Sequence, residues 1–356
     1  QVPTRFDEKG QEKNFRFNRD KINIIKSLQL LIIDEISMVR ADLLDAVDQT
    51  LRRFREPNLP FGGVQLLLIG DLQQLSPVAR EEEWELLKGY YKSPYFFDAL
   101  VFNQCRLITI RLKKNYRQSD DYFISLLRSV GDGNVSGEVL TALNSRFNPD
   151  IANVFQKGYI HLTTHNRQAN EINSKELKAL KGKSIKFTAE ITGIFPDVNY
   201  PVETELEVKV GAQVMFIKND PGKFKRYFNG KIGEVKSIKD ESIEVLCEGN
   251  DLIEVERVVW NNLKYIINEE TKEIEEEVIG TFTHFPLRLA WAITIHKSQG
   301  LTFDKVILDA QAAFAHGQVY VALSRCRTFE GLVLSSKIYS SRSEEHTSEL
   351  QSPYVI

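Results

Sequence analysis

The sequence predicts an α/β protein with two α/β domains and a small β-rich domain inserted into the second. The chain has 356 residues, enough for roughly two or three domains. Two short apolar runs near the start, 30–33 and 66–69, are each followed by acidic residues within two positions. Between about residues 189 and 283 the pattern becomes short alternating segments separated by Gly and Asn. This change of pattern indicates the insertion.

The first predicted domain contains a strand–helix–strand unit. Continuous apolar runs such as 30–33 and 66–69 are typical of strands buried on both faces of a parallel sheet. A further strand is expected at 106–110. Ligands bind beyond the carboxyl ends of such strands, where the acids fall. The helix between the two runs is predicted from apolar residues at helical spacing, namely Leu43, Leu44, Val47, Leu51 and Phe54.

The second predicted domain repeats this organisation. Strands are expected at 159–163, 289–295 and 306–308, and helices at 166–180 and 317–324. The alternating segments between the two halves favour a small β-barrel. Its clearest strand patterns lie at 208–210, 214–217, 232–235 and 243–246.

These patterns give predicted domain limits. The first α/β domain spans 1–115, the second spans 116–188 and 284–341, and the insertion spans 189–283. Residues 342–356 are abruptly polar and resemble a translated adapter oligonucleotide, so we expect a non-native tail, with an ordinary disordered tail as the alternative.

Composition limits the class of protein. Hydrophobic residues make up 42% and charged residues 27%, and no apolar run approaches the roughly 20 residues that span a bilayer. Disordered and membrane-spanning classes are therefore excluded. The three widely spaced cysteines form neither a disulfide framework nor a zinc knuckle, so a cytoplasmic location is expected. A net charge of −3 argues against a globally basic nucleic-acid coat protein but leaves a local basic groove open.

The first acid-tipped strand has the character of a Walker B element. An apolar strand there would hold Asp34 and Glu35 rigidly at a nucleotide's γ-phosphate. Asp34 would hold Mg²⁺, usually through a water, and Glu35 would polarise the attacking water. A solvated strand end is the alternative for such a pair.

The second strand strengthens this interpretation. Gln74 lies just past it, where its amide could hydrogen-bond both the γ-phosphate and the attacking water. A glutamine in a proline-containing loop is usually only part of the loop. Its position one strand–helix–strand unit after the acid pair favours a nucleotide sensor.

At this point the residues resemble the motifs of the Pif-type helicases, in the RecD-like branch of superfamily 1. The similarity covers nearly the whole chain before residue 342, in the family's order. The last two motifs are long and specific. The matching segments are 34–38 (DEISM), 60–63 (PFGG), 70–78 (GDLQQLSPV), 115–118 (NYRQ), 162–166 (LTTHN), 292–302 (AITIHKSQGLT) and 317–325 (GQVYVALSR).

The resemblance implies two RecA-like P-loop NTPase lobes around ATP and Mg²⁺, with an SH3- or OB-like β-barrel over the DNA. It implies ATP-driven 5′ to 3′ translocation on single-stranded DNA, binding to duplex–single-strand junctions, no membrane association and a monomeric protein. Arg117 and Arg325 would act as arginine fingers from the second lobe, and Gly300 would allow close approach near the phosphates.

DNA contacts are implied in several segments. A basic and aromatic loop around the turn 229–230 has the cations and flat rings that single strands require, although a solvated basic loop is an equal alternative. His296 lacks partners at metal-ligand spacing, so a metal role is not expected. The DNA-contact candidates are Phe61, Thr164, His165, Lys225, Asn229, His296, Lys297 and Ser298.

The Walker A loop of the family, GxxxxGK[ST], does not occur in this sequence. Residues 182–184 read Gly-Lys-Ser, but Leu177 stands where the first glycine belongs, and a helical segment precedes them. We therefore expect the first lobe to be incomplete, with uncovered apolar sheet faces, and this chain alone to be inactive. The alternative is a catalytically dead single-stranded-DNA-binding module or accessory subunit.

Overall fold

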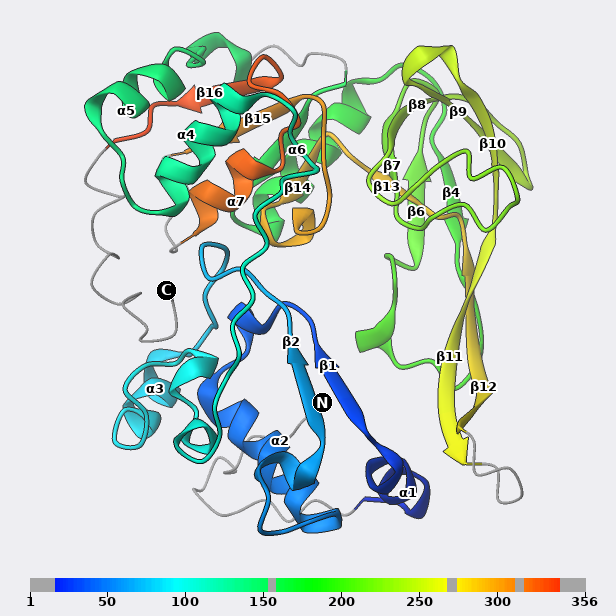
Figure 1. Cartoon of the computed structure of the whole chain (residues 1–356). Helices are drawn as coiled ribbons and strands as arrows, with labels where there is room; N and C mark the ends of the chain where they lie inside the picture. The colour runs from blue at the N-terminus through cyan, green and yellow to red at the C-terminus, as the bar shows by residue number, and fades with distance from the viewer. Residues whose placement is uncertain (1–16, 153–157, 268–273, 311–316, 340–356) are drawn as a thin grey trace. The chain divides into compact units, whose positions relative to one another are not determined.

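The computed structural model describes residues 17–152, 158–267, 274–310 and 317–339 (Figure 1). Two compact units emerge from the distribution of contacts within the chain. Among the described residues, the first contains 17–113 and those of 264–277, and the second contains those of Lys114–Leu263 and of 278–339. Both units mix helices and strands, which confirms the predicted α/β class. The tail predicted at 342–356 lies outside the described residues.

The first unit contains the predicted strand–helix–strand core. Strands β1 and β2 pair in parallel, with Ile33 opposite Leu68. Helix α2 packs its apolar stripe on one face of these strands, where Leu44 is fully buried and Leu51 nearly so. The elements are α1 (Arg19–Ser27), β1 (Leu30–Ile33), α2 (Ala41–Phe54), β2 (Gln65–Leu68) and α3 (Glu81–Leu87).

Two predictions for this unit are corrected. Its strands are not buried on both faces, because Leu30 is 45% and Ile32 is 53% exposed. The segment 106–110 forms no strand, and Ile108 within it is 91% exposed. A strand forms only when a neighbour accepts its backbone hydrogen bonds, and among the described residues none pairs with this segment. Among the described residues, the apolar face that carries Leu30 and Ile32 is therefore uncovered, as expected.

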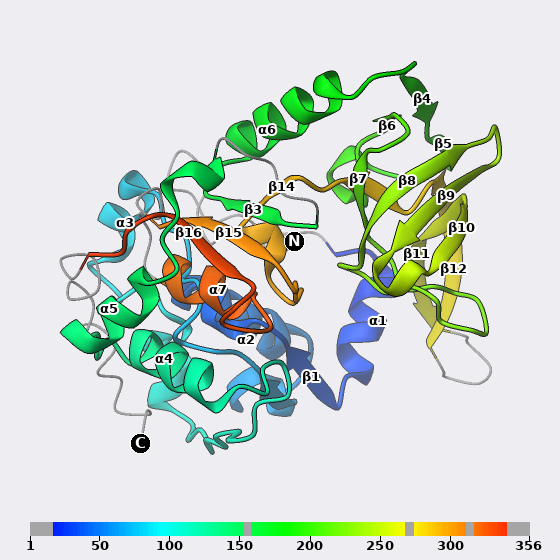
Figure 2. The ribbon, with the colours of Figure 1, turned by 90° about the horizontal axis from the view of Figure 1, so that it is seen from above.

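The second unit has a buried parallel sheet with strand order β14–β3–β15–β16. Figures 1 and 2 show α6 on one face and α4 and α7 on the other. The predicted strands and helices of this half are confirmed, apart from the run 289–295, which is divided. The elements are α4 (Asp121–Gly131), α5 (Gly137–Asn144), β3 (Ile160–Thr163), α6 (Asn166–Ala179), β14 (Ala292–Thr294), β15 (Val306–Asp309), α7 (Gln318–Ser324) and β16 (Leu332–Ser336).

The inserted segment is rich in antiparallel strands, as predicted. A five-stranded sheet has the order β10–β9–β8–β7–β13, and smaller sheets join β11–β12–β5 and β4–β6. Closure into a barrel and the predicted domain limits stay predictions. The strands are β4 (Ile185–Thr188), β5 (Glu190–Gly193), β6 (Glu205–Val208), β7 (Gln213–Phe216), β8 (Ile232–Ile238), β9 (Ser242–Cys247), β10 (Leu252–Glu256), β11 (Val258–Ile267), β12 (Ile274–His284) and β13 (Leu287–Leu289).

The predicted strand 289–295 is two strands. Leu289 ends β13, which pairs with β7 in the insertion, whereas Ala292 begins β14, which pairs with β3 in the parallel sheet. Ala290 and Trp291, both buried, make the turn between the two sheets. A continuous apolar run therefore joins the insertion to the α/β core.

The three cysteines are free thiols. Burial raises the pKa of the Cys247 thiol to about 11 and that of the Cys326 thiol to about 12. Such thiols stay protonated and unreactive at neutral pH. In the described ranges, no helix has the length and apolar character that crossing a membrane requires.

Candidate functional site

The acid pair lies where β1 and β2 end together. The backbone N–H of Ile69 donates to the carbonyl of Ile33, and that of Ile36 donates to the carbonyl of Ile69, both at 2.9 Å. Asp34 is exposed, and its Oδ1 accepts the N–H of Glu35 at 2.9 Å. Glu35 has a φ of 51°, which is uncommon outside glycine and is found at functional turns. Two neighbouring carboxylates thus mark the end of a parallel strand.

Gln74 is held beside this strand end by Asp71, a residue for which the sequence motifs predicted no role. Asp71 accepts the Gln74 Nε2 hydrogen bond at 3.1 Å and the N–H of Gln73 at 3.0 Å. A Cβ on Gly70 would lie 2.9 Å from the Ile36 side chain, so the close approach of the two strand ends requires glycine. Asp71 therefore fixes the amide of Gln74 while leaving its oxygen available as an acceptor.

This strand end offers few protein ligands, as the site of a nucleotide-bound Mg²⁺ does. The described ranges contain no group of three or more His, Cys, Asp or Glu side chains that could hold a metal ion by themselves. Mg²⁺ bound with a nucleotide takes one or two carboxylates, with water and phosphate oxygens as its other ligands. The exposed carboxylate of Asp34 suits that arrangement.

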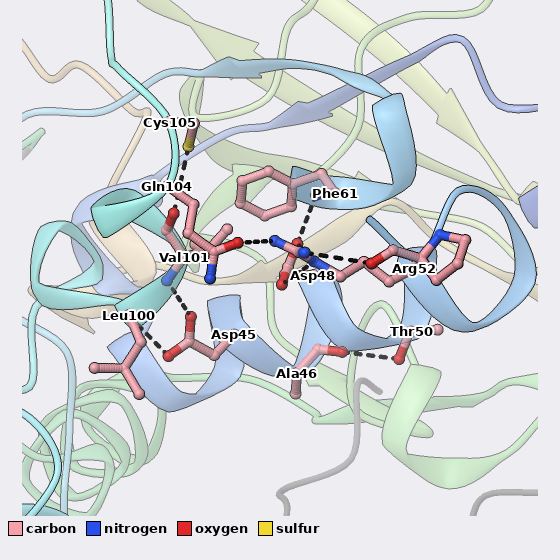
Figure 3. A network of polar contacts seen from close by, with 11 residues as sticks. Asp45, Ala46, Asp48, Thr50, Arg52, Phe61, Leu100, Val101, Gln104 and Cys105 are labelled. Atoms are coloured by element: carbon pink, nitrogen blue, oxygen red, sulfur yellow. Dashed lines mark hydrogen bonds and ion pairs between the residues drawn. The ribbon is translucent and has the colours of Figure 1, made fainter. Parts of the chain in front are cut away.

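Phe61 is anchored in the core of the first unit rather than displayed at its surface (Figure 3). Its side chain is 4% exposed, and its N–H donates to Asp48 Oδ1 at 2.5 Å. Asp48 also pairs with Arg52 at 2.8 Å, and Asp45 accepts the N–H groups of 100–101 at 2.9 and 3.0 Å. Because the ring is buried, the predicted DNA contact of Phe61 could come only from its main chain.

Arg325 is the largest fully buried side chain among the residues that the structure describes, at 1% exposure. Its Nε donates to the Val321 carbonyl at 3.0 Å and its Nη2 to Ser324 Oγ at 2.9 Å. Nη1 lies 3.4 Å from the Leu301 carbonyl, in the segment after the predicted DNA-contact turn. The guanidinium therefore joins α7 to that segment. To reach a phosphate it would have to exchange neutral carbonyl partners for charged oxygens.

Gln118 ties the segment of Arg117 to that of Arg325. Its Nε2 donates to the carbonyls of Ser324 and Cys326, both at 2.9 Å, and its side chain is buried. Asn115 Oδ1 accepts the Arg117 N–H at 2.8 Å and its Nδ2 donates to Gln118 at 3.0 Å. The buried amide of Gln118, three residues after Asn115 in the sequence, thus bridges the carbonyls on both sides of Arg325. The motif 115–118 contains Gln118, but the sequence alone predicted no bridging role for it.

The predicted turn 296–298 divides into exposed and buried residues. His296 and Lys297 are exposed, whereas Ser298 is fully buried and donates through Oγ to the Ile295 carbonyl at 2.7 Å. Gly300 has a φ of 75°, and a Cβ built on it would have open space around it. The backbone could therefore approach a ligand there, while Ser298 has its hydroxyl directed into the turn.

Thr164 and His165 follow the buried strand β3. Thr164 is 8% exposed, and its Oγ1 lies 2.8 Å from His165 Nδ1. The His165 ring is exposed, so it is the more accessible member of this pair.

A pocket of about 520 Å³ in the second unit brings together two predicted DNA contacts, Asn229 and Lys297. Arg288 and Gln299 also line it, and neither was singled out from sequence. Gln299 Nε2 is buried without a hydrogen-bond partner in the described structure. Glu203 is the single carboxylate among the pocket's lining residues. A pocket with surplus donors suits an anionic or carbonyl-rich ligand.

Burial in this pocket changes the behaviour of its cations. Burial lowers the pKa of Arg288, and the opposing effect of the negative charge of Glu203 offsets this only in part. Although Lys297 is exposed as a whole, partial desolvation of its ammonium in the pocket lowers its pKa, and the adjacent positive charge of Arg288 adds to the effect. Two cations facing one carboxylate leave net positive charge, which an anion would stabilise.

The basic loop before Asn229 is only partly available to a ligand. Lys225 is exposed, but its Nζ donates to the Asp220 carbonyl at 3.0 Å. The ring of Tyr227 in this loop is not available to a base, because Tyr227 is 6% exposed and stacks on Phe216 at 4.3 Å between ring centroids.

Comparison with known proteins matches both units to helicases. Residues 1–140 match the PIF1-like helicase model, and residues 289–333 match the UvrD-like helicase C-terminal domain. The crystal structure of Bacteroides sp. Pif1 in complex with ADP-AlF4 superposes with a TM-score of 0.86 at 40% identity, covering 92% of this chain and 75% of that one. The chain belongs to the PIF1-like helicase family. The α/β RecA-like helicase fold expected from the resemblance is therefore supported at the level of the fold.

Two further relatives extend this similarity. Bacteroides Pif1 bound to single-stranded DNA is 39% identical, with a TM-score of 0.62 over 95% of this chain and 77% of that one. The human ATP-dependent DNA helicase PIF1 is 35% identical over 316 residues, which are 85% of this PIF1-like chain and 45% of the human protein. The chain thus spans about half the length of this curated relative.

Proposed function

We propose that this PIF1-like chain is part of an ATP-dependent DNA helicase. The observation that carries the proposal is the paired strand end in the first unit, where Asp34 and Glu35 lie beside Asp71 and Gln74. Parallel strands ending in acids and a fixed amide are suited to an Mg²⁺-bound triphosphate and an attacking water.

Each side chain at this strand end has a separate proposed task. Mg²⁺, when bound with ATP, supplies positive charge that offsets charge on the transferring phosphoryl group. Asp34 would hold the ion, usually through a water, and Glu35 would accept the proton of the attacking water. Gln74, oriented by Asp71, would hydrogen-bond the water and the γ-phosphate. Arg117 and Arg325 would stabilise the developing phosphate charge.

Single-stranded DNA is the proposed polymer substrate. Support comes from the surplus donors around Arg288, Lys297 and Gln299, and from the related Bacteroides Pif1, whose crystal structure is of the protein bound to single-stranded DNA. Translocation 5′ to 3′, action at duplex junctions and a monomeric state are proposals that rest on the family resemblance. The exposed residues His165, His296 and Lys297 are the proposed backbone contacts.

We expect residues 1–341 alone to bind single-stranded DNA without hydrolysing ATP. The sequence lacks the loop lysine and the hydroxyl that anchor a nucleotide's phosphates, so we expect low nucleotide affinity. The measurement is phosphate release with and without single-stranded DNA. DNA-stimulated turnover by this segment would contradict the expectation. If residues 1–341 neither hydrolysed ATP nor bound DNA, the proposal that this chain is the DNA-binding part of a helicase would be contradicted.

The role of Glu35 can be tested in a longer protein that supplies the phosphate-binding loop. Glu35→Gln should abolish ATP turnover and preserve DNA binding, because it removes the proton acceptor but keeps the side chain's size. Glu85→Gln is the matched control, since Glu85 lies in an exposed ion pair with Lys88. Retained turnover in Glu35→Gln would show that another group is the base.

A further inference from the structure

The loop between β7 and β8 has an ordered framework. Asp220 is 6% exposed, and its carboxylate accepts the N–H of Gly222 at 2.7 Å and that of Arg226 at 2.8 Å. Its backbone N–H donates to the Tyr227 carbonyl at 3.0 Å. The N–H of Asn229 is held by Asn219 Oδ1 at 2.9 Å. These contacts fix the backbone on both sides of residues 223–225.

Phe224 projects from this framework into solvent. Its side chain is 85% exposed, whereas the nearby Phe228 is 51% exposed and Tyr227 is buried. An apolar ring of this size gains roughly 25 cal/mol for each Å² removed from water, so leaving it exposed gives up stabilising free energy. Nothing in the folding of this loop requires an aromatic residue at its tip.

The lysines near Phe224 differ in whether their ammonium groups already have a partner within the protein. The ammonium of Lys225 is bound to the Asp220 carbonyl, and that of Lys231 to Asp251 at 2.9 Å. Lys223 makes neither an ion pair nor a hydrogen bond with any residue that the structure describes. The loop tip therefore presents an uncommitted cation directly beside an exposed ring.

We propose that Phe224 stacks on a base of single-stranded DNA while Lys223 contacts the adjoining phosphate. A flat ring beside a cation, held on an ordered loop, is the combination with which proteins bind single strands without reading sequence. Asn229, at the other end of the same loop, lines the donor-rich pocket with Lys297 and Arg288. The loop thus joins a base-stacking position to a site suited to phosphate. This inference rests on the proposed DNA binding and names the residue that contacts a base.

Two ligands with equal charge separate stacking from phosphate contact. The full chain would be titrated with a fluorescent oligothymidylate of about 12 nucleotides and with an abasic oligonucleotide of the same length, within the usual range of site sizes. Phe224→Ala should weaken oligothymidylate binding roughly 5- to 150-fold, the range for loss of one stacked base. Binding of the abasic ligand should not change, because it has phosphates and no bases. Phe224→Trp, which keeps an aromatic ring for stacking, should bind oligothymidylate about as tightly as the unaltered chain.

Lys223→Gln should act differently. It should weaken both ligands alike and reduce the slope of log affinity against log salt by about 0.7, the value for one phosphate contact on a single strand. Tyr90→Ala, which removes a 64% exposed aromatic residue of the first unit, is the control and should change neither ligand's affinity.

Several results would overturn the inference. Unchanged oligothymidylate affinity in Phe224→Ala would do so while leaving the proposed function intact, as would an equal loss for both ligands. If oligothymidylate affinity fell in Phe228→Ala but not in Phe224→Ala, the stacking ring would be Phe228 and the inference would be wrong. If Phe224→Ala abolished binding to anionic lipid vesicles but not to DNA, the loop tip would be a membrane contact. Failure of the unaltered chain to bind either oligonucleotide would overturn both proposals.

Discussion

The parallel sheets of the two units consist of similar short apolar strands but differ sharply in burial. In β15, Val306, Ile307 and Leu308 are at most 1% exposed, whereas in β1 Leu30 is 45% and Ile32 is 53% exposed. β15 has a strand on each side and helices on both faces of its sheet (Figures 1 and 2), while β1 and β2 have packing partners on one face only among the described residues. An apolar strand is therefore buried only when neighbouring elements cover both of its faces.

The largest expected effect contrasts two isoleucines within strands of the two sheets. Ile307→Ala should lower the free energy of unfolding of the second unit by about 2–5 kcal/mol, because a fully buried side chain leaves a cavity. Ile32→Ala should change that of the first unit by less than about 0.5 kcal/mol. Hydrogen exchange during urea titration, read at amides of β15 and β1, measures the two units separately. An equal cost at Ile32 would show that its face is covered in solution.

The units should also respond differently to acid. Burial lowers the pKa of His284 to about 4, with the positive charge of Arg257 adding to the effect, and burial alone lowers that of His161 to about 4. Residues 1–113 contain no histidine. An unfolded histidine titrates near 6.5, so between about pH 6.5 and pH 4 only the unfolded chain gains the proton.

The second unit should therefore lose up to about 3 kcal/mol of stability per buried histidine as the pH falls through this range. His284→Phe should remove part of this acid-induced loss, because it removes one of the two titrating groups. A phenyl ring suits the position, since the His284 ring lies near Phe282 and Phe285. Replacing the exposed His165 with Gln is the control and should preserve the loss. Urea unfolding at pH 7, 5.5 and 4 gives the comparison. A variant His284→Phe with the full acid sensitivity would contradict the assignment.

A smaller effect compares two glutamines. Gln118→Leu should cost the second unit about 1–3 kcal/mol, because two buried carbonyls lose their donor while side-chain volume is nearly kept. Gln104→Leu in the first unit should cost less than about 0.5 kcal/mol, since Gln104 is exposed and accepts one hydrogen bond from Arg52. Thermal unfolding of both variants measures the difference. Equal costs would show that the buried amide of Gln118 is not a brace.

Local sequence patterns predicted the helices α2, α6 and α7 and the strands β1, β2, β3, β7, β8, β9 and β15, but not the helices α1, α3, α4 and α5. The apolar runs at 30–33 and 306–308 form strands, and the helical spacing from Leu43 to Phe54 forms α2. Each signal is carried by neighbouring residues, so one sequence suffices to read it. The segment 106–110 has the same apolar character but is not a strand, because pairing depends on a partner that no local pattern contains.

By itself, the sequence determined the α/β class and the motif order that places the chain in the PIF1-like helicase family. It also located the acid pair Asp34–Glu35 and the amide Gln74, because strand ends and polar turns are local features. Only the tertiary structure decided which side chains face outward. It buried Phe61 and Arg325, turned the hydroxyl of Ser298 inward and left Phe224 exposed. Exposure depends on residues far away in the chain, such as Asp48 beneath Phe61, and their packing sets which groups a ligand can reach.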